Sequence, residues 1–312
     1  MNAPAPSLSL FPYRLFFRAS ETLAFPAAGA SNIIRGALGT VLRKMAGSGD
    51  VPGATRPAYF RLFAPTRTAR ASGFADPPRP FVLRAAALDG HCIEAGDAFH
   101  FDLYLFEHSE QALPQLALAF SQLAQDGLGP HRARVELQSI ELLDETCRPS
   151  LTVFANGRIV ASCPRPLVLP LSDERAQISR IQVAFATPTE LKSDGVLATT
   201  PEFGVLFARL RDRIAALCNL YGSGPLQIDF REMGVRAGQV HLVDSALEWR
   251  DEERRSSRTG QTHPLGGFTG TVTYEGDLAE FLPWLKAGYW TGVGRQTVWG
   301  KGLILLPEEP PR

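Results

Sequence analysis

The segment GVGRQTVWGKG at residues 292–302 spaces four glycines as GxGxxxxxGxG, between an expected helix and an expected strand. Glycine tolerates positive φ and lets backbone N–H groups approach a bound anion. The segment also carries two cations and an indole ring on which a base can stack. We therefore expect a phosphate- or nucleotide-binding loop, with a tight helix-to-strand turn as the alternative. The expected binding residues are Gly292, Gly294, Arg295, Trp299, Gly300, Lys301 and Gly302.

Two familiar nucleotide-binding motifs are excluded. A P-loop requires GxxxxGK followed by Ser or Thr, whereas Lys301 precedes Gly302. A dinucleotide fingerprint requires a strand, then the glycines, then a helix, and the order expected here is the reverse. Hydrolysis of a nucleoside triphosphate and dinucleotide chemistry are therefore not predicted.

The charge is unevenly distributed along the chain. The formal net charge is zero, but residues 1–84 hold eleven basic and three acidic residues, a net of +8, which the remaining residues balance with −8. Of the 32 basic residues, 28 are Arg, whose guanidinium binds phosphate and stacks on bases. The basic end favours a polyanionic partner such as RNA, with a solvated surface of balanced charge as the alternative.

Six segments of the first half show strand or helix periodicity. Ile34, Leu38, Val41 and Leu42 recur at helical spacing, and Ser31 or Asn32 is expected to cap that helix. Residues 47–80 read as a long basic loop. The order is a strand at 11–20, a helix at 31–46, strands at 81–88 and 98–106, a helix at 111–125 and a strand at 132–143.

The same order recurs in the second half. An Asn156-Gly157 turn predicts a hairpin over 151–161 near the boundary between the halves. The pattern predicts an α+β protein with two tandem ferredoxin-like (βαββαβ, RRM-like) domains, at 1–147 and 148–312. The expected elements of the second domain are a strand at 178–186, a helix at 203–221, strands at 240–250 and 267–275, a helix at 277–287 and a strand at 302–306.

The glycine-rich segment resembles the glycine-rich loop of the RAMP superfamily of CRISPR-associated proteins. The wider run from GGFTGTVTYEG at 266–276 through residue 302 resembles the C-terminal domain of their precursor-crRNA endoribonucleases, the sixth Cas protein family. The stretches ATPTELKSDG, NIIRGALGTVLRK, PPRPFVLR and GLGPHRARVELQSIEL extend the resemblance over nearly the whole chain.

The resemblance implies RNA cleavage without a metal ion or other cofactor. The RNA's own 2′-hydroxyl attacks the adjacent phosphate, which leaves a 2′,3′-cyclic phosphate and a 5′-hydroxyl. Many relatives place a catalytic histidine near the first helix, but the first histidine here is His91. Other relatives use Lys, Arg and Tyr, for which Lys44 and Arg43 at the end of the first helix, with Tyr59 and Arg61 beyond it, are the matching candidates. A solvated helix end is the alternative for Lys44.

A polar segment between two expected strands carries the other candidates. His263 is the one histidine expected to reach RNA and act in catalysis. Arg254, Arg255 and Arg258 are expected to contact an RNA stem, together with Arg35, Arg43 and Arg61 from the basic end, or else to form a solvated hairpin tip.

Two functions remain open at this point. The first is a CRISPR repeat RNA endoribonuclease, and the second is a catalytically inactive RAMP protein that binds guide RNA as a subunit of an effector complex. The expected partners are CRISPR repeat RNA or crRNA and other Cas proteins. No cofactor or metal site is predicted, because the four cysteines form no CxxC pair. Neither a membrane span nor a signal peptide is evident, so a cytoplasmic location is expected.

Overall fold

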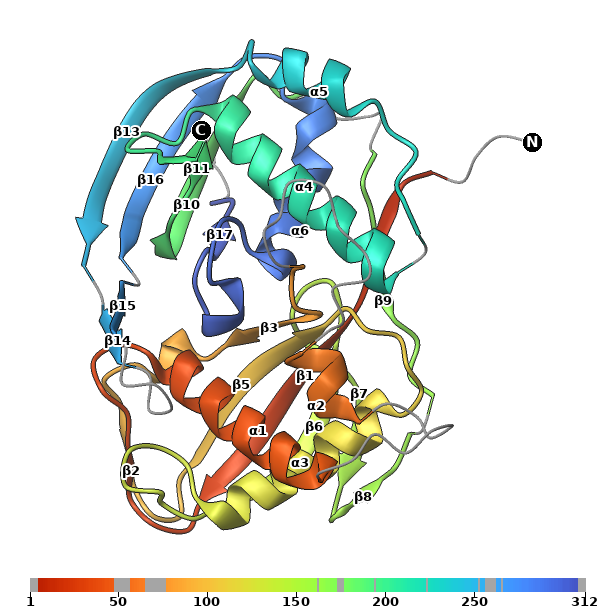
Figure 1. Cartoon of the computed structure of the whole chain (residues 1–312), viewed down its shortest axis with the longest axis vertical. Coiled ribbons are helices and arrows are strands. Elements are labelled where there is room, and N and C mark those ends of the chain that lie inside the picture. The colour runs from red at the N-terminus through yellow and green to blue at the C-terminus, as the bar shows by residue number, and fades with distance from the viewer. Residues whose placement is uncertain are drawn as a thin grey trace.

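The structure is a computed structural model of the 312-residue chain. It describes residues 5–47, 57–64, 77–161, 163–172, 177–193, 195–222, 224–251, 253–255, 262–264 and 266–307. Figure 1 shows two α/β layers stacked one above the other, with the first half of the chain below and the second half above.

The first half forms a ferredoxin-like domain. Its strand order is β3-β5-β1-β6 with antiparallel neighbours, which is the order of a split βαβ unit. The predicted long loop contains a short helix, α2. The elements are β1 (Ser7–Ala19), β2 (Leu23–Ala24), α1 (Ala30–Ala46), α2 (Ala58–Leu62), β3 (Phe81–Arg84), β4 (Cys92–Ile93), β5 (Ala98–Leu105), α3 (Ala112–Asp126) and β6 (Val135–Leu143).

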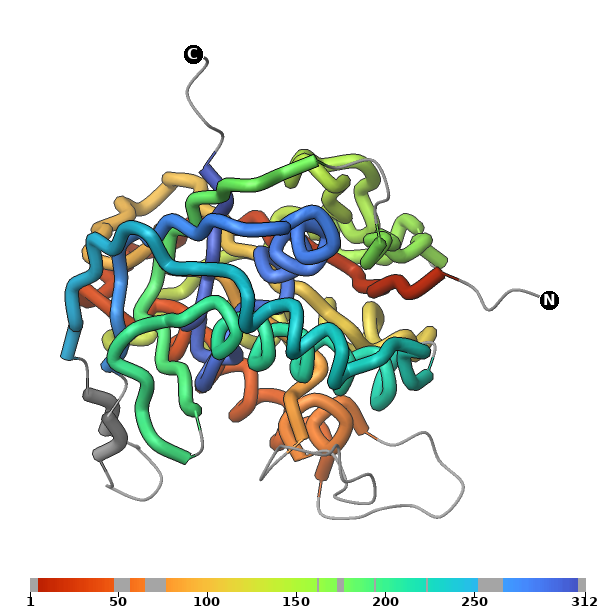
Figure 2. The backbone as a smooth tube through the Cα atoms, turned by 90° about the horizontal axis from the view of Figure 1, so that it is seen from above, coloured from red at the N-terminus to blue at the C-terminus, as the bar shows by residue number. Residues whose placement is uncertain are grey.

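Three further strands join this first sheet. The predicted hairpin is confirmed as β7 (Pro149–Ala155) and β8 (Arg158–Ile159), with positive φ at Asn156 and Gly157 in its turn. It extends the sheet beyond β6, while β9 (Leu167–Pro170) pairs with the start of β1. Figure 2 shows the red start of β1 beside the yellow-green part of the chain. Sheet pairing of the first layer therefore continues to Pro170.

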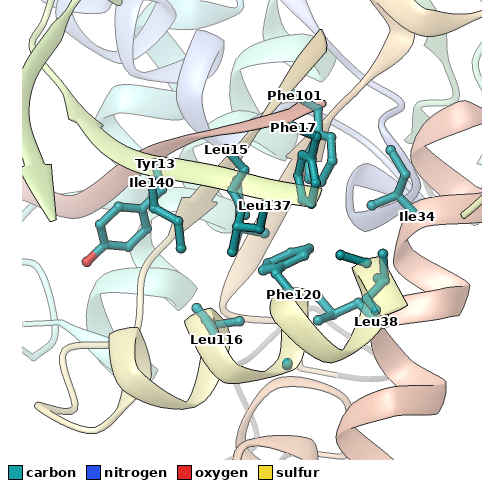
Figure 3. Close-up of a cluster of buried hydrophobic side chains, with 14 of the residues drawn as sticks. Tyr13, Leu15, Phe17, Ile34, Leu38, Phe101, Leu116, Phe120, Leu137 and Ile140 are labelled. Carbon is teal, nitrogen blue, oxygen red and sulfur yellow. The ribbon is translucent and has the colours of Figure 1, made fainter. Parts of the chain in front are cut away.

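Alternating side chains of this sheet build the first core. Phe17 stacks between Phe99 and Phe101 at centroid distances of 5.4 and 5.3 Å. Figure 3 shows Leu38 of α1 and Phe120 of α3 facing this strand layer. Full burial of each such side chain stabilises the fold by about 1.5–3 kcal/mol.

The second half repeats the topology. Its sheet has the order β13-β16-β10-β17, again a split βαβ unit. The extra helix α5 precedes β13, and Asp229 caps it by accepting from the backbone N–H groups of Arg231 and Glu232. The elements are β10 (Arg180–Thr189), β11 (Lys192–Ser193), β12 (Val196–Leu197), α4 (Phe203–Tyr221), α5 (Phe230–Ala237), β13 (His241–Arg250), β14 (Glu253–Arg255), β15 (Thr262–Pro264), β16 (Gly267–Glu275), α6 (Leu282–Thr291) and β17 (Ile304–Leu305).

The second core also joins the two domains. The face of the first sheet that points away from α1 and α3 is also apolar. It contributes Val82, Tyr104 and Phe106 to the buried cluster that contains Trp284 and Trp290 of α6. Tyr104 and Trp290 meet edge to face at 4.9 Å. The two layers are therefore held together by a shared apolar interface.

The expectation for the start of α1 was wrong. Gly29, with φ of 94°, is the N-cap residue, and neither Ser31 nor Asn32 fills that position. The Asp89 carboxylate accepts the first helical N–H, from Ala30, at 2.7 Å. The Ser31 hydroxyl instead accepts the N–H of Ala85 at 3.0 Å, because the segment after β3 runs past this end of the helix.

Candidate nucleic-acid interface

The glycine-rich segment connects α6 to β17 at the junction of the two domains (Figure 1). It contains the 3-10 turn η3 (Thr297–Trp299), which contacts both α1 and β3 of the first domain. Gly300, with φ of 85°, lies so close to α1 that an added Cβ would be 2.4 Å from the Ser31 hydroxyl oxygen. The glycine therefore permits direct contact between the segment and the first turn of α1.

Backbone N–H groups of this segment donate within the protein. Val293 donates to the carbonyl of Gly302 at 2.9 Å, and Gly302 donates to Pro188 at 3.2 Å. Arg295 donates through its backbone to the carbonyl of Glu190, also at 3.2 Å. The bonds from Gly302 and Arg295 fix the segment to the end of β10, and the bond from Val293 closes the segment on itself. All three groups are therefore already occupied as donors.

The two cations of the segment differ in exposure. The Arg295 side chain is exposed and forms an ion pair with Glu190 at 2.7 Å. Lys301 is buried, with 5% of its surface exposed. Only Arg295 of the two is accessible in this conformation.

An aromatic and cationic array crosses the domain junction. The guanidinium of Arg35 on α1 lies 5.7 Å from the Trp299 ring of the glycine-rich segment and 5.1 Å from the Phe63 ring. Phe63 stacks on Tyr59 of α2, with centroids 6.0 Å apart and planes 2° apart. Gly39 makes room for Phe63, since an added Cβ would be 2.8 Å from its ring. The structure thus brings together three sequence-predicted residues, Arg35, Tyr59 and Trp299.

Arg43 and Lys44 lie further along α1. Lys44 is nine residues beyond Arg35, which corresponds to roughly 14 Å along the helix axis. Its ammonium pairs with Asp126 of α3 at 3.0 Å, while 64% of its side chain remains exposed. Hydrogen bonds from Gln122 and then Lys44 lower the pKa of Asp126. Lys44 lines a groove of about 410 Å³ between α1 and α3.

Arg61 lies against the first sheet. Its Nε donates to a carboxylate oxygen of Glu107 at 2.5 Å, and both side chains are 12% exposed. Burial raises the pKa of Glu107, although the charge of Arg61 opposes that shift. This ion pair fixes α2 to the end of β5.

The predicted hairpin tip lies partly outside the described residues. The backbone pairs β14 with β15 and places Arg254 opposite His263 and Arg255 opposite Thr262. This small ladder prolongs β13 and β16 (Figure 1). Arg258 lies outside the described residues, as do Arg56, Arg67 and Arg70 of the basic loop.

Two arginines with buried guanidinium nitrogens are not among the residues that the sequence singles out. Arg213 is 5% exposed and lies on the buried face of α4 with Leu210, Ile214 and Leu217. The i, i+3, i+4, i+7 spacing of these four residues was the available signal. Burial lowers the pKa of Arg213 to about 9 and that of Arg84, at the end of β3, to about 10.

A small interdomain cavity of about 210 Å³ lies beside Arg84. Arg14 lines it and donates to both carboxylate oxygens of Asp102, at 2.7 and 3.0 Å. His100, also in the lining, has its pKa lowered by burial and then by the charge of Arg14. Tyr289 of α6 closes the cavity from the second domain, and its hydroxyl lies 3.3 Å from that of Tyr104.

The described part of the chain contains no cluster of side chains that could bind a metal ion. There, no three His, Cys, Asp or Glu side chains gather in a way that could hold a metal ion. The four cysteines, Cys92, Cys147, Cys163 and Cys218, are free thiols. Among the helices of the described ranges, none is long and apolar enough to cross a membrane.

Two family models match the chain and together cover most of it. The AF_1859_N model, described as an N-terminal domain, matches residues 8–167. The model of the CRISPR-associated endoribonuclease Cas6 matches residues 183–304, which include the glycine-rich segment. A comparison with curated proteins finds no match.

Solved structures share the fold across nearly the whole chain. A Thermus thermophilus Cas6 in a product complex has a TM-score of 0.54 at 16% identity, covering 96% of this chain and 99% of the other. A Cas6 substrate mimic complex has a TM-score of 0.51 at 17% identity, covering 96% and 100%. A partial Cas6-RT-Cas1–Cas2 complex has a TM-score of 0.56 at 13% identity, covering 97% of this chain and 47% of the other.

The fold and the junction site define a protein of the α+β class with tandem ferredoxin-like domains and a glycine-rich segment between them. The two family models match in order along the chain, and residues 183–304 belong to the CRISPR-associated endoribonuclease Cas6 family.

Proposed function

We propose that this protein cuts CRISPR repeat RNA once, without a metal ion, to release guide RNA. The observation that carries the proposal is the match of residues 183–304 to the Cas6 endoribonuclease model, in a chain whose glycine-rich segment touches α1 of the other domain. The structures it resembles include Cas6 bound to a product and to a substrate mimic. CRISPR repeat RNA is therefore the proposed substrate.

The proposed reaction uses the RNA's own nucleophile. The 2′-oxygen bonds to the adjacent phosphorus, the bond from phosphorus to the 5′-oxygen of the next nucleotide breaks, and a 2′,3′-cyclic phosphate forms. The 2′-proton passes to a general base, and a general acid gives a proton to the leaving 5′-oxygen. The protein must also hold the two oxygens in line with phosphorus and stabilise the charged phosphorane.

Tyr59 and Lys44 are the proposed proton-transfer and charge-stabilising groups. Tyr59 is half-buried and held by its stack on Phe63, which fixes the position of its phenol. Lys44 is exposed and paired with Asp126, so an incoming phosphate would compete with that carboxylate for its ammonium. His263, on the β14–β15 hairpin, is the third candidate.

The RNA-binding residues of the proposal come from both domains. Arg35 and Trp299 form the array across the junction, where a base can stack and a phosphate can meet the guanidinium. Arg295 is exposed on the glycine-rich segment, and Arg43 is exposed roughly 12 Å further along α1 than Arg35. Arg254, Arg255 and Arg258 are proposed to contact the RNA stem from the hairpin.

The first prediction tests the reaction itself. Purified protein is incubated in EDTA with its repeat RNA and with the same RNA carrying a deoxyribose at the cleavage position. We expect single cleavage of the all-ribose RNA only, with a 2′,3′-cyclic phosphate on the upstream product. Cleavage that needs added Mg²⁺, or that survives the deoxyribose, would contradict the proposed chemistry.

Variants of the same assay test the residues. Tyr59→Phe is expected to lower kcat about 100-fold and Lys44→Ala at least about tenfold, the range typical of proton transfer and charge stabilisation. Lys286→Ala, which removes an exposed lysine of α6, is the matched control and is expected to cut at the wild-type rate. Wild-type kcat in Tyr59→Phe would exclude the phenol as a proton-transfer group.

A second candidate function is an inactive RAMP protein that binds guide RNA within a larger complex. The observation favouring it is the lack of any histidine before His91, the region in which many relatives place one. A complex that combines Cas6 with RT, Cas1 and Cas2 is among the structures with this fold, so other Cas proteins are proposed partners. Tight binding of the repeat RNA without cleavage would favour this second function.

A further inference from the structure

Two arginines with buried guanidinium nitrogens hold the last turn of α6. Arg84 of β3 donates from Nη2 to the carbonyl oxygen of Tyr289 at 3.0 Å. Arg213 of α4 donates from Nε to the carbonyl oxygen of Thr291 at 2.9 Å. Carbonyls in the last turn of a helix lack partners within the helix and carry partial negative charge, so cations suit this position.

Within the described residues, both arginines have buried guanidinium nitrogens that lack a hydrogen-bond partner. Neither guanidinium lies within ion-pair distance of a carboxylate there, and Nε and Nη1 of Arg84 and Nη2 of Arg213 are buried without a hydrogen-bond partner. Burial is the largest cause of the lowered pKa of each, and the charge of Arg84 adds to the shift at Arg213. A well-packed apolar side chain would avoid the cost of burying these charges.

The turn that they hold leads directly into the glycine-rich segment. Tyr289 and Thr291 precede Gly292 by three residues and one residue. Gly292 lies against Arg84, since a Cβ added there would be 3.3 Å from Nη2. The position of this turn therefore determines where the segment begins.

The residue after Arg84 connects to α1. The backbone N–H of Ala85 donates to the hydroxyl of Ser31 in the first turn of α1. Ser31 is also the residue against which Gly300 packs. Two consecutive residues of the first domain thus fix both the start of α1, which carries Arg35, and the end of α6, which leads into the segment that carries Trp299.

We infer that Arg84 is a positioning residue that sets the glycine-rich segment against α1 across the domain junction, with Arg213 fixing the same turn from within the second domain. The inference rests on the proposed function. It explains why unpaired charges are buried here, because only a long, multi-donor cation can reach from β3 to a carbonyl of the other domain. Small displacements of groups that orient a substrate lower the rate of the chemical step strongly.

The experiment compares Arg84→Met, Arg84→Lys and the control Arg236→Met in single-turnover and steady-state cleavage of the repeat RNA. Arg236 bonds Glu280 just before α6, so its replacement disturbs the opposite end of the same helix. We expect Arg84→Met to lose at least about tenfold in kcat with KM within about twofold, while its thermal midpoint is unchanged or higher. Arg84→Lys should recover part of kcat, and Arg236→Met should match the wild type.

Amide hydrogen exchange supplies a readout independent of cleavage. Arg84→Met should accelerate exchange in peptides covering 289–302 and 30–35, and Arg236→Met should not. Wild-type kcat in Arg84→Met, unchanged exchange in both peptides, or an Arg84→Lys variant no better than Arg84→Met would each overturn the inference. If the wild-type protein cuts no RNA, the proposed function fails, and exchange alone then decides whether Arg84 sets the segment against α1.

Discussion

At the scale of single residues, the glycines of the glycine-rich segment allow neighbouring atoms to approach its backbone closely. Gly300 touches Ser31 across the domain junction, and Gly302 lies where a Cβ would be 2.0 Å from the carbonyl oxygen of Val293. Backbone N–H groups of the segment donate within the protein, those of Gly292, Val293, Arg295, Trp299, Gly300 and Gly302. Its glycines therefore serve packing first, and its contribution to RNA binding comes from the side chains that it presents.

Gly300→Ala is predicted to destabilise the protein by about 1–3 kcal/mol, because a Cβ there meets the Ser31 side chain in a left-handed backbone conformation. Gly36→Ala is the control, since it adds a Cβ to α1 in open space and should stabilise by about 0.5–1 kcal/mol. Urea unfolding of both variants measures these changes. Equal stability of Gly300→Ala and the wild type would show that the contact yields without cost.

The sequence predicts which residues form the site better than it predicts whether each of them is buried. Arg35 and Trp299 were both expected to bind RNA, and the structure places them side by side. Burial of Lys301 and of the Arg84 guanidinium nitrogens could not be predicted, because it depends on how one domain covers the other and not on local periodicity. Arg213 is different, since its position within an apolar stripe was visible in the sequence.

At the scale of elements, periodic apolar patterns predicted helices well. The helix expected at 203–221 is found at those residues as α4, and those expected at 31–46 and 111–125 are within one residue at each end. The helix expected at 277–287 is found instead at Leu282–Thr291 as α6, and a 3-10 turn at Ala279–Phe281 precedes it. The bounds were not predicted correctly because almost every side chain of α6 is buried, so no polar face marks the ends of the helix. Pairing of β9 with β1 had no local signal, since it joins residues far apart in the chain.

Tyr289→Phe is predicted to reduce the loss of stability at high pH. Burial raises the pKa of Tyr289 to about 12, whereas an unfolded tyrosine ionises near about 10. The folded state thus favours the neutral phenol, so the contribution to the free energy of unfolding is complete below pH about 10 and is lost as the pH rises toward about 12. Denaturant unfolding between pH 8 and 11 should show a smaller decline for Tyr289→Phe. Parallel declines would indicate that Tyr289 ionises alike in both states.

At the scale of the whole molecule, the basic N-terminal quarter and the acidic remainder make opposite contributions to an RNA surface. Some of the basic side chains form ion pairs within the protein, Arg61 with Glu107 and Arg14 with Asp102. Arg43 has an exposed side chain on α1, so it remains accessible to phosphate. RNA affinity should therefore depend on a few accessible cations and not on the total charge of the chain.

Binding of the repeat RNA is predicted to weaken steeply as salt rises, because each neutralised phosphate releases condensed counterions. Arg43→Ala should weaken binding and reduce the slope of log K against log salt by about 1. Arg180→Ala is the control, since that arginine pairs with Glu275 on the second sheet. Filter binding at several KCl concentrations measures both slopes. An unchanged slope in Arg43→Ala would exclude a phosphate contact there.

The length of β1 determines how the chain can be divided. Its first residues, including Leu8 and Leu10, contribute to the second core and pair with β9, while Tyr13, Leu15 and Phe17 fill the first core. A fragment ending at residue 147 would lose the partner strands of both β6 and the start of β1 and would expose their edges. We therefore expect neither half to fold on its own. Expression of either half alone should give aggregated protein, and co-expression of the two halves should prevent this.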